Sequence, residues 1–316
     1  MTSEPTFRQL QYAVAVDDHR HFGRAAASLH VSQPGLSAQI RELEKRLGVS
    51  LFERATSTTR PTQAGQDLLE RARRIIGEVN DLAVAANLHN GELRGVLRVA
   101  AIPTIAPYLL PTVTQLFHRE WPHADLELAE LRTSTLVDSI ERSEADLGLL
   151  ALPAETRNLH TEPLVFERFH LAVPDSHTFT DDRPVSVSAL SGFQLLLLEE
   201  GHCLRDHALA ACRTVTGMEH RELRKVGLTV LVQMVATGKG ATLLPEFSLP
   251  VEARDGSGIV TRPIEEPTVG RELALVWRST DPRSELFRCA AAIVRTTLQA
   301  RQAIAPDAKR PVRVTQ

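Results

Sequence analysis

Residues 22–48, FGRAAASLHVSQPGLSAQIRELEKRLG, decide the fold of the first part of the chain. Apolar side chains recur at helical spacing on both sides of a short break at residues 30–31, which indicates two helices in close succession. Ser32 followed by Pro34 is typical of a helix start, and Gly48 is typical of a helix end. The stretch therefore predicts a helix-turn-helix, although it also fits a helical domain that binds no DNA.

The second helix of this pair has a polar face that suits DNA. Short polar side chains and an arginine near a helix N-terminus can reach base edges in the major groove and nearby phosphates. Residues 51–62 then predict a short hairpin or wing. We expect DNA contacts from Ser32, Gln33, Pro34, Ser37, Arg41 and Arg54. Because residues 1–60 carry eight basic and six acidic side chains, each chain makes few phosphate contacts, and tight binding requires linked copies.

A long helix is predicted from Gln63 to about Asn90. Its apolar positions are Leu68, Leu69, Ala72, Ile75, Ile76, Val79, Leu82 and Ala86. An apolar stripe without a neighbouring helix in the sequence needs a partner, and a second copy of the chain is the simplest one. We therefore expect this helix to dimerise the protein.

After Gly91 the pattern changes to strands that alternate with helices, up to about Gln302. This alternation is typical of βαβ units and predicts mostly parallel sheets, in two similar α/β lobes around a cleft. The expected domains are a winged helix-turn-helix (1–62), a linker and dimerisation helix (63–91), an effector domain (92–302) and a mobile tail (303–316). Lobe I would comprise residues 92–165 and 269–302, and lobe II residues 166–268.

Composition limits the class of protein. The 316 residues are 43% hydrophobic and 24% charged, which excludes a disordered chain, a collagen-like fibre and a disulfide scaffold. No apolar run is long enough to cross a bilayer, and residues 1–5 do not resemble a secretory signal. We expect a cytoplasmic protein with no membrane partner. Without a recognisable catalytic, phosphate-binding or zinc-ligand pattern, we also expect no metal, no cofactor and no enzymatic turnover.

Two of the three cysteines form a candidate switch. Cys203 and Cys212 lie nine residues apart in a segment predicted to be helical from Cys203 to Val215. In a helix their side chains leave opposite faces and their Cα atoms lie about 13 Å apart, whereas a disulfide needs less than about 7 Å. A bond between them would therefore require this helix to unwind.

The position of Cys203 favours oxidation chemistry. A thiol at a helix N-terminus, beside His202 and Arg205, favours the reactive thiolate, which peroxide converts to a sulfenic acid that a second thiol can trap. Simple packing of both cysteines is the alternative interpretation. For Cys289, on the last helix, we expect packing in the core.

The run of residues 22–54, together with RPTQAG at residues 60–65, resembles the winged helix-turn-helix of LysR-type transcriptional regulators. The resemblance implies a recognition helix at residues 33–47, a wing at residues 53–61 and a linker helix that dimerises. It also implies a two-lobed α/β effector domain similar to a type II periplasmic binding protein.

The segment EEGHCLRDHALAAC, residues 199–212, closely resembles the redox loop of peroxide-sensing members of this family, and residues 102–111 and 242–245 also resemble segments of those members. The resemblance implies that Cys203 is the peroxidatic cysteine and Cys212 the resolving cysteine. It implies peroxide-binding roles for Thr104, Thr133, His202, Asp206 and Arg271. The chain departs from the expected pattern at His207, where glutamine is expected, and at residues 227–230.

The resemblance further implies promoter DNA as a partner, a homotetramer built from dimers, RNA polymerase as a candidate partner and a cellular thiol reductant that resets the switch. Two other functions fit parts of the sequence. One is a LysR-type regulator that binds a small organic effector between the lobes and has inert cysteines. The other is a thiol peroxidase or solute-binding protein fused to a helical domain.

Overall fold

The computed structural model describes residues 4–53, 59–89, 93–177, 183–211 and 220–304. The chain forms two compact units that divide close to residue 91. The first unit contains helices α1 to α4, and the second contains strands β1 to β9 with helices α5 to α10.

The first unit is a small helical domain around the predicted helix pair. Helices α1 (Phe7–His19), α2 (Phe22–Ser28) and α3 (Gln33–Leu47) share an apolar core. The Ser32 hydroxyl accepts a hydrogen bond from the Gly35 amide at the start of α3, and Gly48 ends the helix in the left-handed conformation. Both predicted helix ends are confirmed.

The described residues between α3 and α4 are held by two contacts. The Glu44 carboxylate accepts a hydrogen bond from the Leu51 amide (2.7 Å), and Phe52 pairs with Pro61 in an antiparallel bridge. Residues 54–58, which include Arg54, lie outside the described residues. Helix α4 (Gln63–His89) follows, with Arg73 paired to Asp17 of α1 (3.0 Å).

Helix α4 has both a packed and an exposed apolar surface. Leu69 and Ala72 are buried within the first unit, whereas Ile75, Val79 and Leu82 are exposed. The exposed three follow each other at intervals of four and three residues, which places them on one face of the helix. The described residues thus leave part of the predicted stripe uncovered.

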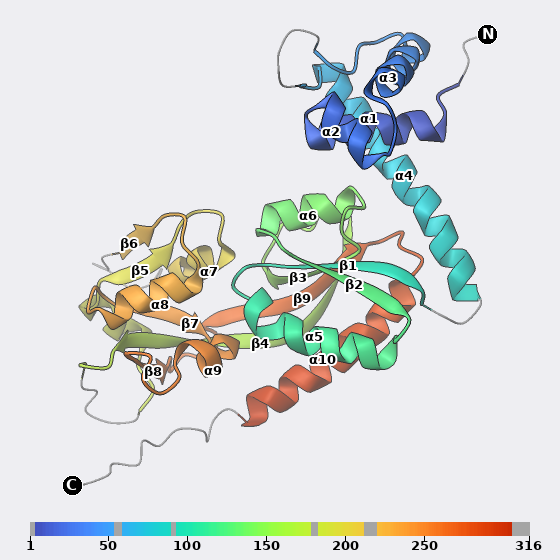
Figure 1. Cartoon of the computed structure of the whole chain (residues 1–316). Helices are drawn as coiled ribbons and strands as arrows, with labels where there is room; N and C mark the ends of the chain where they lie inside the picture. The colour runs from blue at the N-terminus through green and yellow to red at the C-terminus, as the bar shows by residue number, and fades with distance from the viewer. Residues whose placement is uncertain (1–3, 54–58, 90–92, 178–182, 212–219, 305–316) are drawn as a thin grey trace. The chain divides into compact units, whose positions relative to one another are not determined.

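The second unit is built on a mixed sheet in the order β2-β1-β3-β9-β4-β7, with β8 paired to β4 (Figure 1). The strands are β1 (Gly95–Ala101), β2 (Ala124–Glu130), β3 (Leu147–Leu152), β4 (Leu159–Pro174), β7 (Thr242–Pro245), β8 (Ile259–Pro263) and β9 (Gly270–Arg278). Strand β1 is parallel to β2 and β3, but β9 is antiparallel to β3 and β4.

The prediction of mostly parallel sheets is therefore wrong. Strand β9 comes from the far end of the sequence and inserts between β3 and β4 in the opposite direction. Strand β4 is also antiparallel to β7 and β8. The alternation of strands and helices in the sequence predicts the order of the elements. It does not predict beside which strand, or in which direction, a distant strand such as β9 pairs.

Strand β4 joins the two groups of strands in this unit (Figure 1). Its residues 159–168 pair with β9, and its residues 169–174 pair with β7 and β8. The second group is completed by a small parallel pair, β5 (Leu195–Leu198) and β6 (His220–Leu223). This arrangement gives the two lobes that the sequence predicts.

Helices and 3-10 turns cover the strands. They are α5 (Ala106–Glu120), α6 (Thr133–Glu141), η1 (Val187–Gly192), α7 (Cys203–Ala211), α8 (Leu228–Ala236), η2 (Glu246–Ser248), α9 (Leu249–Glu252) and α10 (Ser284–Ile304). The helix predicted at 203–215 is described only as far as Ala211, so Cys212 lies outside the described residues. The predicted tail overlaps the end of α10, and residues 305–316 also lie outside them.

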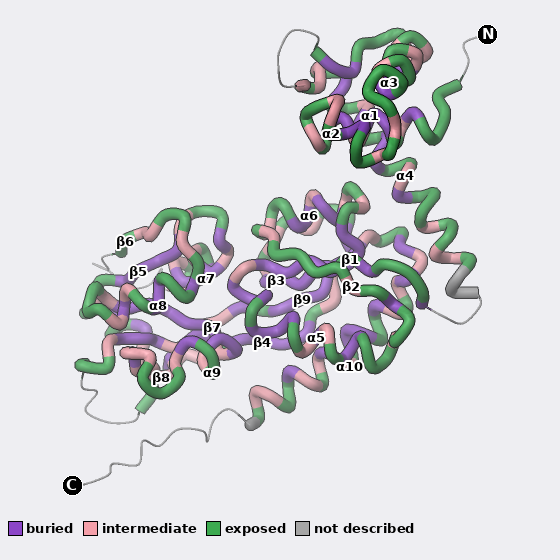
Figure 2. Tube along the Cα trace, in the orientation of Figure 1, coloured by how far each residue is buried: buried purple, intermediate pink, exposed green. Residues whose placement is uncertain are grey.

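The core of the second unit lies along the central strands, which Figure 2 shows as buried. Helix α10 packs on it through Phe287, Ala291, Val294 and Leu298, which recur at helical spacing. Cys289 is exposed, so its predicted place in the core is wrong. Two residues after Phe287 correspond to about 200° around the helix, which turns Cys289 away from the packed face.

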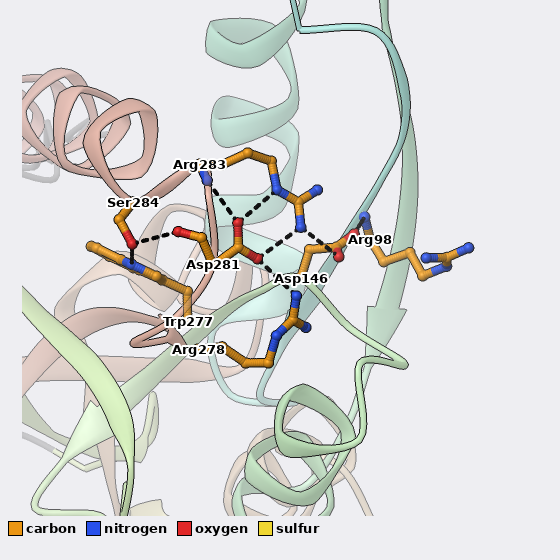
Figure 3. Close-up of polar contacts among 7 residues, drawn as sticks. All are labelled: Arg98, Asp146, Trp277, Arg278, Asp281, Arg283 and Ser284. Carbon is orange, nitrogen blue, oxygen red and sulfur yellow. Dashed lines mark hydrogen bonds and ion pairs between the residues drawn. The ribbon is translucent and has the colours of Figure 1, made fainter. Parts of the chain in front are cut away.

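A buried ion cluster fastens the start of α10 to the sheet (Figure 3). Arg283 donates hydrogen bonds to Asp281 and to Asp146 (2.8 Å to each through Nη2). Arg278 also donates to Asp281, and the Asp146 carboxylate accepts from the Arg98 amide of β1. Each carboxylate thus has several donors, as a buried charge requires.

We predict that Asp281→Asn lowers the free energy of unfolding by about 3–5 kcal/mol, because it leaves the buried Arg283 and the half-buried Arg278 guanidinium groups without their shared counter-charge. Glu285→Gln on the same segment is the matched control, since its side chain is 87% exposed, and it should change stability by less than about 0.5 kcal/mol. Urea denaturation of the purified chain measures both. Equal effects would contradict a structural role for the cluster.

Candidate functional site

Cys203 is presented by the turn that connects β5 to α7. Buried Leu198 ends β5, and Cys203 is the first residue of α7, half-buried with a free thiol. Gly201 has a φ of +91°, a left-handed conformation that favours glycine. The turn therefore depends on a glycine two residues before the thiol.

Arg132 covers this turn from the other lobe. Its guanidinium donates to the Glu199 carboxylate, and a Cβ on Gly201 would lie 3.3 Å from Arg132 Nη1. The same hydrogen bond holds the pKa of Glu199 below its usual value. An ion pair and a close packing contact thus fix the residues that precede Cys203.

A cavity of about 310 Å³ opens beside the thiol. It is lined by Thr133, Ser134, Val137, Asp138, Pro153, Glu155, Arg157, Gly201, Cys203 and Asp206. Thr133 begins α6, and its Oγ1 is buried with no hydrogen-bond partner among the described residues. A free hydroxyl in the same cavity as the thiol could donate a hydrogen bond to a small polar molecule bound there.

His202 and Asp206 flank Cys203 in different environments. His202 is buried, and burial together with the nearby Arg132 lowers its pKa, against the opposing effect of Glu199. Asp206 is exposed and accepts a hydrogen bond from Arg205 (2.8 Å). The thiol therefore has beside it in the chain a buried imidazole whose surroundings disfavour its charged form, and an exposed carboxyl group at the rim of its cavity.

Thr104 and Arg271 form a second, fully buried group. Arg271 on β9 donates to Thr104 Oγ1 (2.7 Å) and to the Thr104 carbonyl (3.0 Å), and its Nε donates to Glu167 (2.8 Å). The other Glu167 oxygen accepts from the Phe247 amide (2.9 Å). Because Arg271 occupies an acceptor site of the Thr104 hydroxyl, the hydroxyl proton is free to point elsewhere.

The predicted peroxide-binding residues are thus brought together in two groups. Cys203, Thr133 and Asp206 line one cavity, with His202 adjacent in sequence, while Thr104 and Arg271 bind each other. Arg271 lines a second cavity of about 790 Å³, and Pro153 lines both cavities. Pro153, in the segment that follows β3, is therefore a residue that the cavities of both groups share.

Sequence reasoning missed Glu167, Arg132 and Glu199. Glu167 fixes Arg271, and Arg132 and Glu199 fix the turn before Cys203. An acidic residue in the middle of an apolar strand pattern was the available signal for Glu167, because a buried carboxylate needs a partner. The Arg132 and Glu199 pair is 67 residues apart and leaves no local signal.

Helix α3 of the first unit holds most of the predicted DNA contacts. Ser32, Gln33, Pro34 and Arg41 are exposed, and Ser37 is half-buried. Buried Leu36, Ile40 and Leu43 hold the opposite face of the helix in the core. The polar face is therefore available to a partner, whereas Arg54 lies outside the described residues.

Membrane and metal features were sought in the described part of the chain. None of its helices combines the length and the apolar character that crossing a bilayer requires. No three His, Cys, Asp or Glu side chains of these residues are grouped so that they could hold a metal ion.

Comparison with known proteins supplies the family. Residues 7–66 match the model of the bacterial regulatory helix-turn-helix protein of the LysR family, and residues 90–299 match the LysR substrate binding domain. The chain belongs to the LysR family. It is 39% identical over 292 residues to a hydrogen peroxide-inducible genes activator of Pectobacterium carotovorum subsp. carotovorum, over 92% of this chain and 96% of that protein.

Two solved structures of OxyR are similar to this LysR-family chain. A full-length OxyR variant of Pseudomonas aeruginosa is 33% identical, with a TM-score of 0.79 over 93% of this chain and 95% of that one. A hydrogen peroxide-bound OxyR mutant of Corynebacterium glutamicum is also 33% identical, with a TM-score of 0.64 over 96% of both chains. The similarity therefore spans both the DNA-binding and the regulatory parts of the family fold.

We predict that Gly201→Ala lowers the free energy of unfolding by about 1–2 kcal/mol, because a Cβ is unfavourable at this positive φ. The matched control is Gly192→Ala, where a Cβ would meet nothing within 4 Å and which should change stability by less than about 0.5 kcal/mol. Urea denaturation compares the two variants. An unchanged midpoint for Gly201→Ala would contradict the assigned turn conformation.

Proposed function

We propose that the chain is a peroxide-sensing transcriptional regulator, in which Cys203 reacts with hydrogen peroxide and then forms a reversible disulfide with Cys212. The observation that carries this proposal is the placement of Cys203, a free thiol at the start of α7 and in a cavity shared with Thr133 and Asp206. Relatives with similarity along almost the whole chain are activators of hydrogen peroxide-inducible genes.

The length of α7 supports a conformational switch rather than oxidation of Cys203 alone. Cys203 and Ala211 are the ends of α7, about 12 Å apart along the axis at 1.5 Å per residue. The Cα atom of the next residue lies only about 3.8 Å from that of Ala211. This step is too short to bring it within the distance of about 7 Å from the Cys203 Cα atom that a disulfide needs. A bond from Cys203 to the residue after Ala211 therefore requires α7 to open.

The chemistry is a two-step oxidation of two thiols. The Cys203 thiolate attacks one peroxide oxygen, the O–O bond breaks, and the other oxygen leaves as water after it takes a proton. The Cys212 thiol then attacks the sulfenic sulfur, and the S–O bond breaks with loss of a second water. A cellular thiol reductant would return both thiols. Because each signal oxidises the pair once, the protein is a regulator and not an enzyme.

The surrounding residues are assigned roles that follow their contacts. Thr133 offers its unpartnered hydroxyl to the bound peroxide, and Asp206 and His202 complete the polar surroundings of the thiol. Arg271 acts through Thr104, because its donors are bonded to Thr104 and Glu167. Hydrogen bonds donated by the Thr133 and Thr104 hydroxyl groups would stabilise negative charge on the leaving oxygen.

Arg205 is proposed to hold the reduced form closed. Its Nε donates to the Glu222 carboxylate of β6 (2.7 Å), and its Nη1 donates to Asp206. The bond to Glu222 joins the first turn of α7 to the strand beside β5, whereas the bond to Asp206 lies within α7. Opening α7 must break or rearrange them, so the pair contributes to the stability of the reduced form.

DNA recognition is assigned to the exposed polar face of α3, with Arg54 as a further contact. We propose the division into residues 1–62, 63–91 and 92–302, with dimerisation through the stripe Ile75, Val79 and Leu82 and a tetramer built from two dimers. RNA polymerase is the expected partner on promoter DNA. A promoter as target also places the protein in the cytoplasm.

We predict that Cys203→Ser abolishes the intramolecular disulfide and the peroxide-dependent change in DNA footprint. Cys289→Ser is the matched control: its thiol is exposed on α10, so the variant should respond like the wild type. Thiol mass spectrometry after one equivalent of peroxide, with footprinting of the same samples, measures both. A normal response in Cys203→Ser would instead favour a regulator with inert cysteines and a small organic effector.

We predict that Gln33→Ala weakens binding to a duplex selected by the wild-type protein by about 10- to 100-fold, which corresponds to about 1–3 kcal/mol for one lost base contact. Gln11→Ala is the matched control, because Gln11 is exposed on α1 and outside the assigned DNA face. Fluorescence anisotropy at fixed salt compares the affinities. If both variants bind like the wild type, α3 is not the reading helix.

A further inference from the structure

The cavity beside Cys203 is assembled from both lobes. Thr133 and other residues of α6 line it together with the segment that follows β3, and these belong to lobe I. Gly201, Cys203 and Asp206 line it from lobe II. The buried Thr133 hydroxyl and the thiol are thus carried by different lobes. How a molecule in the cavity meets both groups depends on how the two sets of lining residues are held together.

Arg132 joins the two sets from the position directly before Thr133. Its carbonyl accepts a hydrogen bond from the Leu136 amide (2.8 Å), so its backbone is bonded to the first turn of α6. Its guanidinium extends to lobe II, where it donates to the Glu199 carboxylate. A shift of the Arg132 backbone would therefore move Thr133 with it.

Glu199 is connected to the thiol by one turn of backbone. It directly follows β5, and its carbonyl accepts a hydrogen bond from the His202 amide (3.3 Å), the residue before Cys203. The Arg132 side chain also packs on this turn, since a Cβ on Gly201 would lie 3.3 Å from Arg132 Nη1 and 3.9 Å from Cδ. One side chain thus contacts the residues two and four positions before the thiol.

We propose that Arg132 is a positioning residue for the reaction of Cys203 with peroxide, and that it acts by holding the Thr133 hydroxyl in place relative to the thiol. This inference rests on the proposed function, in which Thr133 donates a hydrogen bond to the bound peroxide. Arg132 is not among the described residues that line the cavity, so we assign it no contact with the peroxide. It acts through the residues on either side of that molecule.

The expected effect is modest because water reaches the ion pair. The Arg132 side chain is 44% exposed and that of Glu199 is 18% exposed. Exposed ion pairs are screened by water and salt and contribute little. A small displacement of a hydrogen-bond donor nevertheless slows a reaction that depends on its position. Loss of the pair should lower the second-order rate constant with peroxide by about threefold to fivefold.

The test measures two reactions of the Cys203 thiol in full-length chains. Arg132→Met removes the guanidinium but keeps an unbranched side chain against Gly201, and Glu199→Met removes the acceptor. Mass spectrometry follows loss of the thiol after addition of hydrogen peroxide or of iodoacetamide. Alkylation by iodoacetamide has no leaving oxygen to stabilise, so it reports the reactivity of the thiol itself. Either variant should slow the peroxide reaction as above and change the alkylation rate by less than about twofold.

Arg98→Met is the matched control. The Arg98 side chain is also 44% exposed, and it pairs with Glu127 (3.4 Å) between β1 and β2. Neither residue is among those that line the cavity beside the thiol. This variant should react with both reagents like the wild type.

Two double-mutant cycles test how Arg132 acts. The double variant of Arg132→Met and Glu199→Met should be no slower with peroxide than either single variant, because the two side chains act as one contact. In a Thr133→Val background, Arg132→Met should cause no further loss, because the donor that it positions is already absent.

An unchanged peroxide rate in Arg132→Met would overturn the role of Arg132 and leave the proposed function intact. Equal slowing of the peroxide and iodoacetamide reactions would also overturn it, because Arg132 would then act on the thiol and not through Thr133. The same holds for an undiminished effect of Arg132→Met in the Thr133→Val background. Absence of any reaction between Cys203 and peroxide in the wild type would overturn the proposed function as well.

Discussion

The regulatory unit depends on one constraint: a wound α7 cannot bring its two ends within disulfide distance. Cys203 begins the helix and Ala211 ends it, so a bond that reaches past Ala211 is available only to an opened chain. In the proposed switch, oxidation would therefore select between two backbone arrangements instead of adding a crosslink to one of them. A bond between two sulfur atoms would in this way change the backbone conformation of the whole α7 segment.

The contacts around α7 divide into a fixed and a releasable set. Arg271, Glu167 and Thr104 are fully buried and bonded to each other, and breaking such an ion pair is costly. The bond that α7 makes through its own side chain, from Arg205 to Glu222, lies on the segment that the proposed switch would open. A buried polar group on the sheet thus lies beside the helix that the proposed switch would open.

Local features of the fold were predictable, and long-range ones were not. Ser32 and Gly48 mark the ends of α3 through their own backbone preferences, so sequence alone located them. Strand β9 pairs with β3 and β4 from more than 90 residues away, and the direction of that pairing depends on the whole chain. Cys203 and its motif were visible in the sequence, whereas Glu167 and the Arg132–Glu199 pair became recognisable only through their tertiary partners. Cys289 was misplaced because its apolar neighbours surround it in sequence but lie on another helix face.

Hydrogen exchange of the α7 backbone tests the central claim most directly. Amide exchange, followed by mass spectrometry of peptides that cover residues 204–211, is compared between the reduced protein and the same protein with the Cys203–Cys212 bond. The account predicts slow exchange in the reduced form and loss of protection across these amides in the oxidised form, while peptides of β3 and β9 stay protected. Equal protection of α7 in both forms would contradict it.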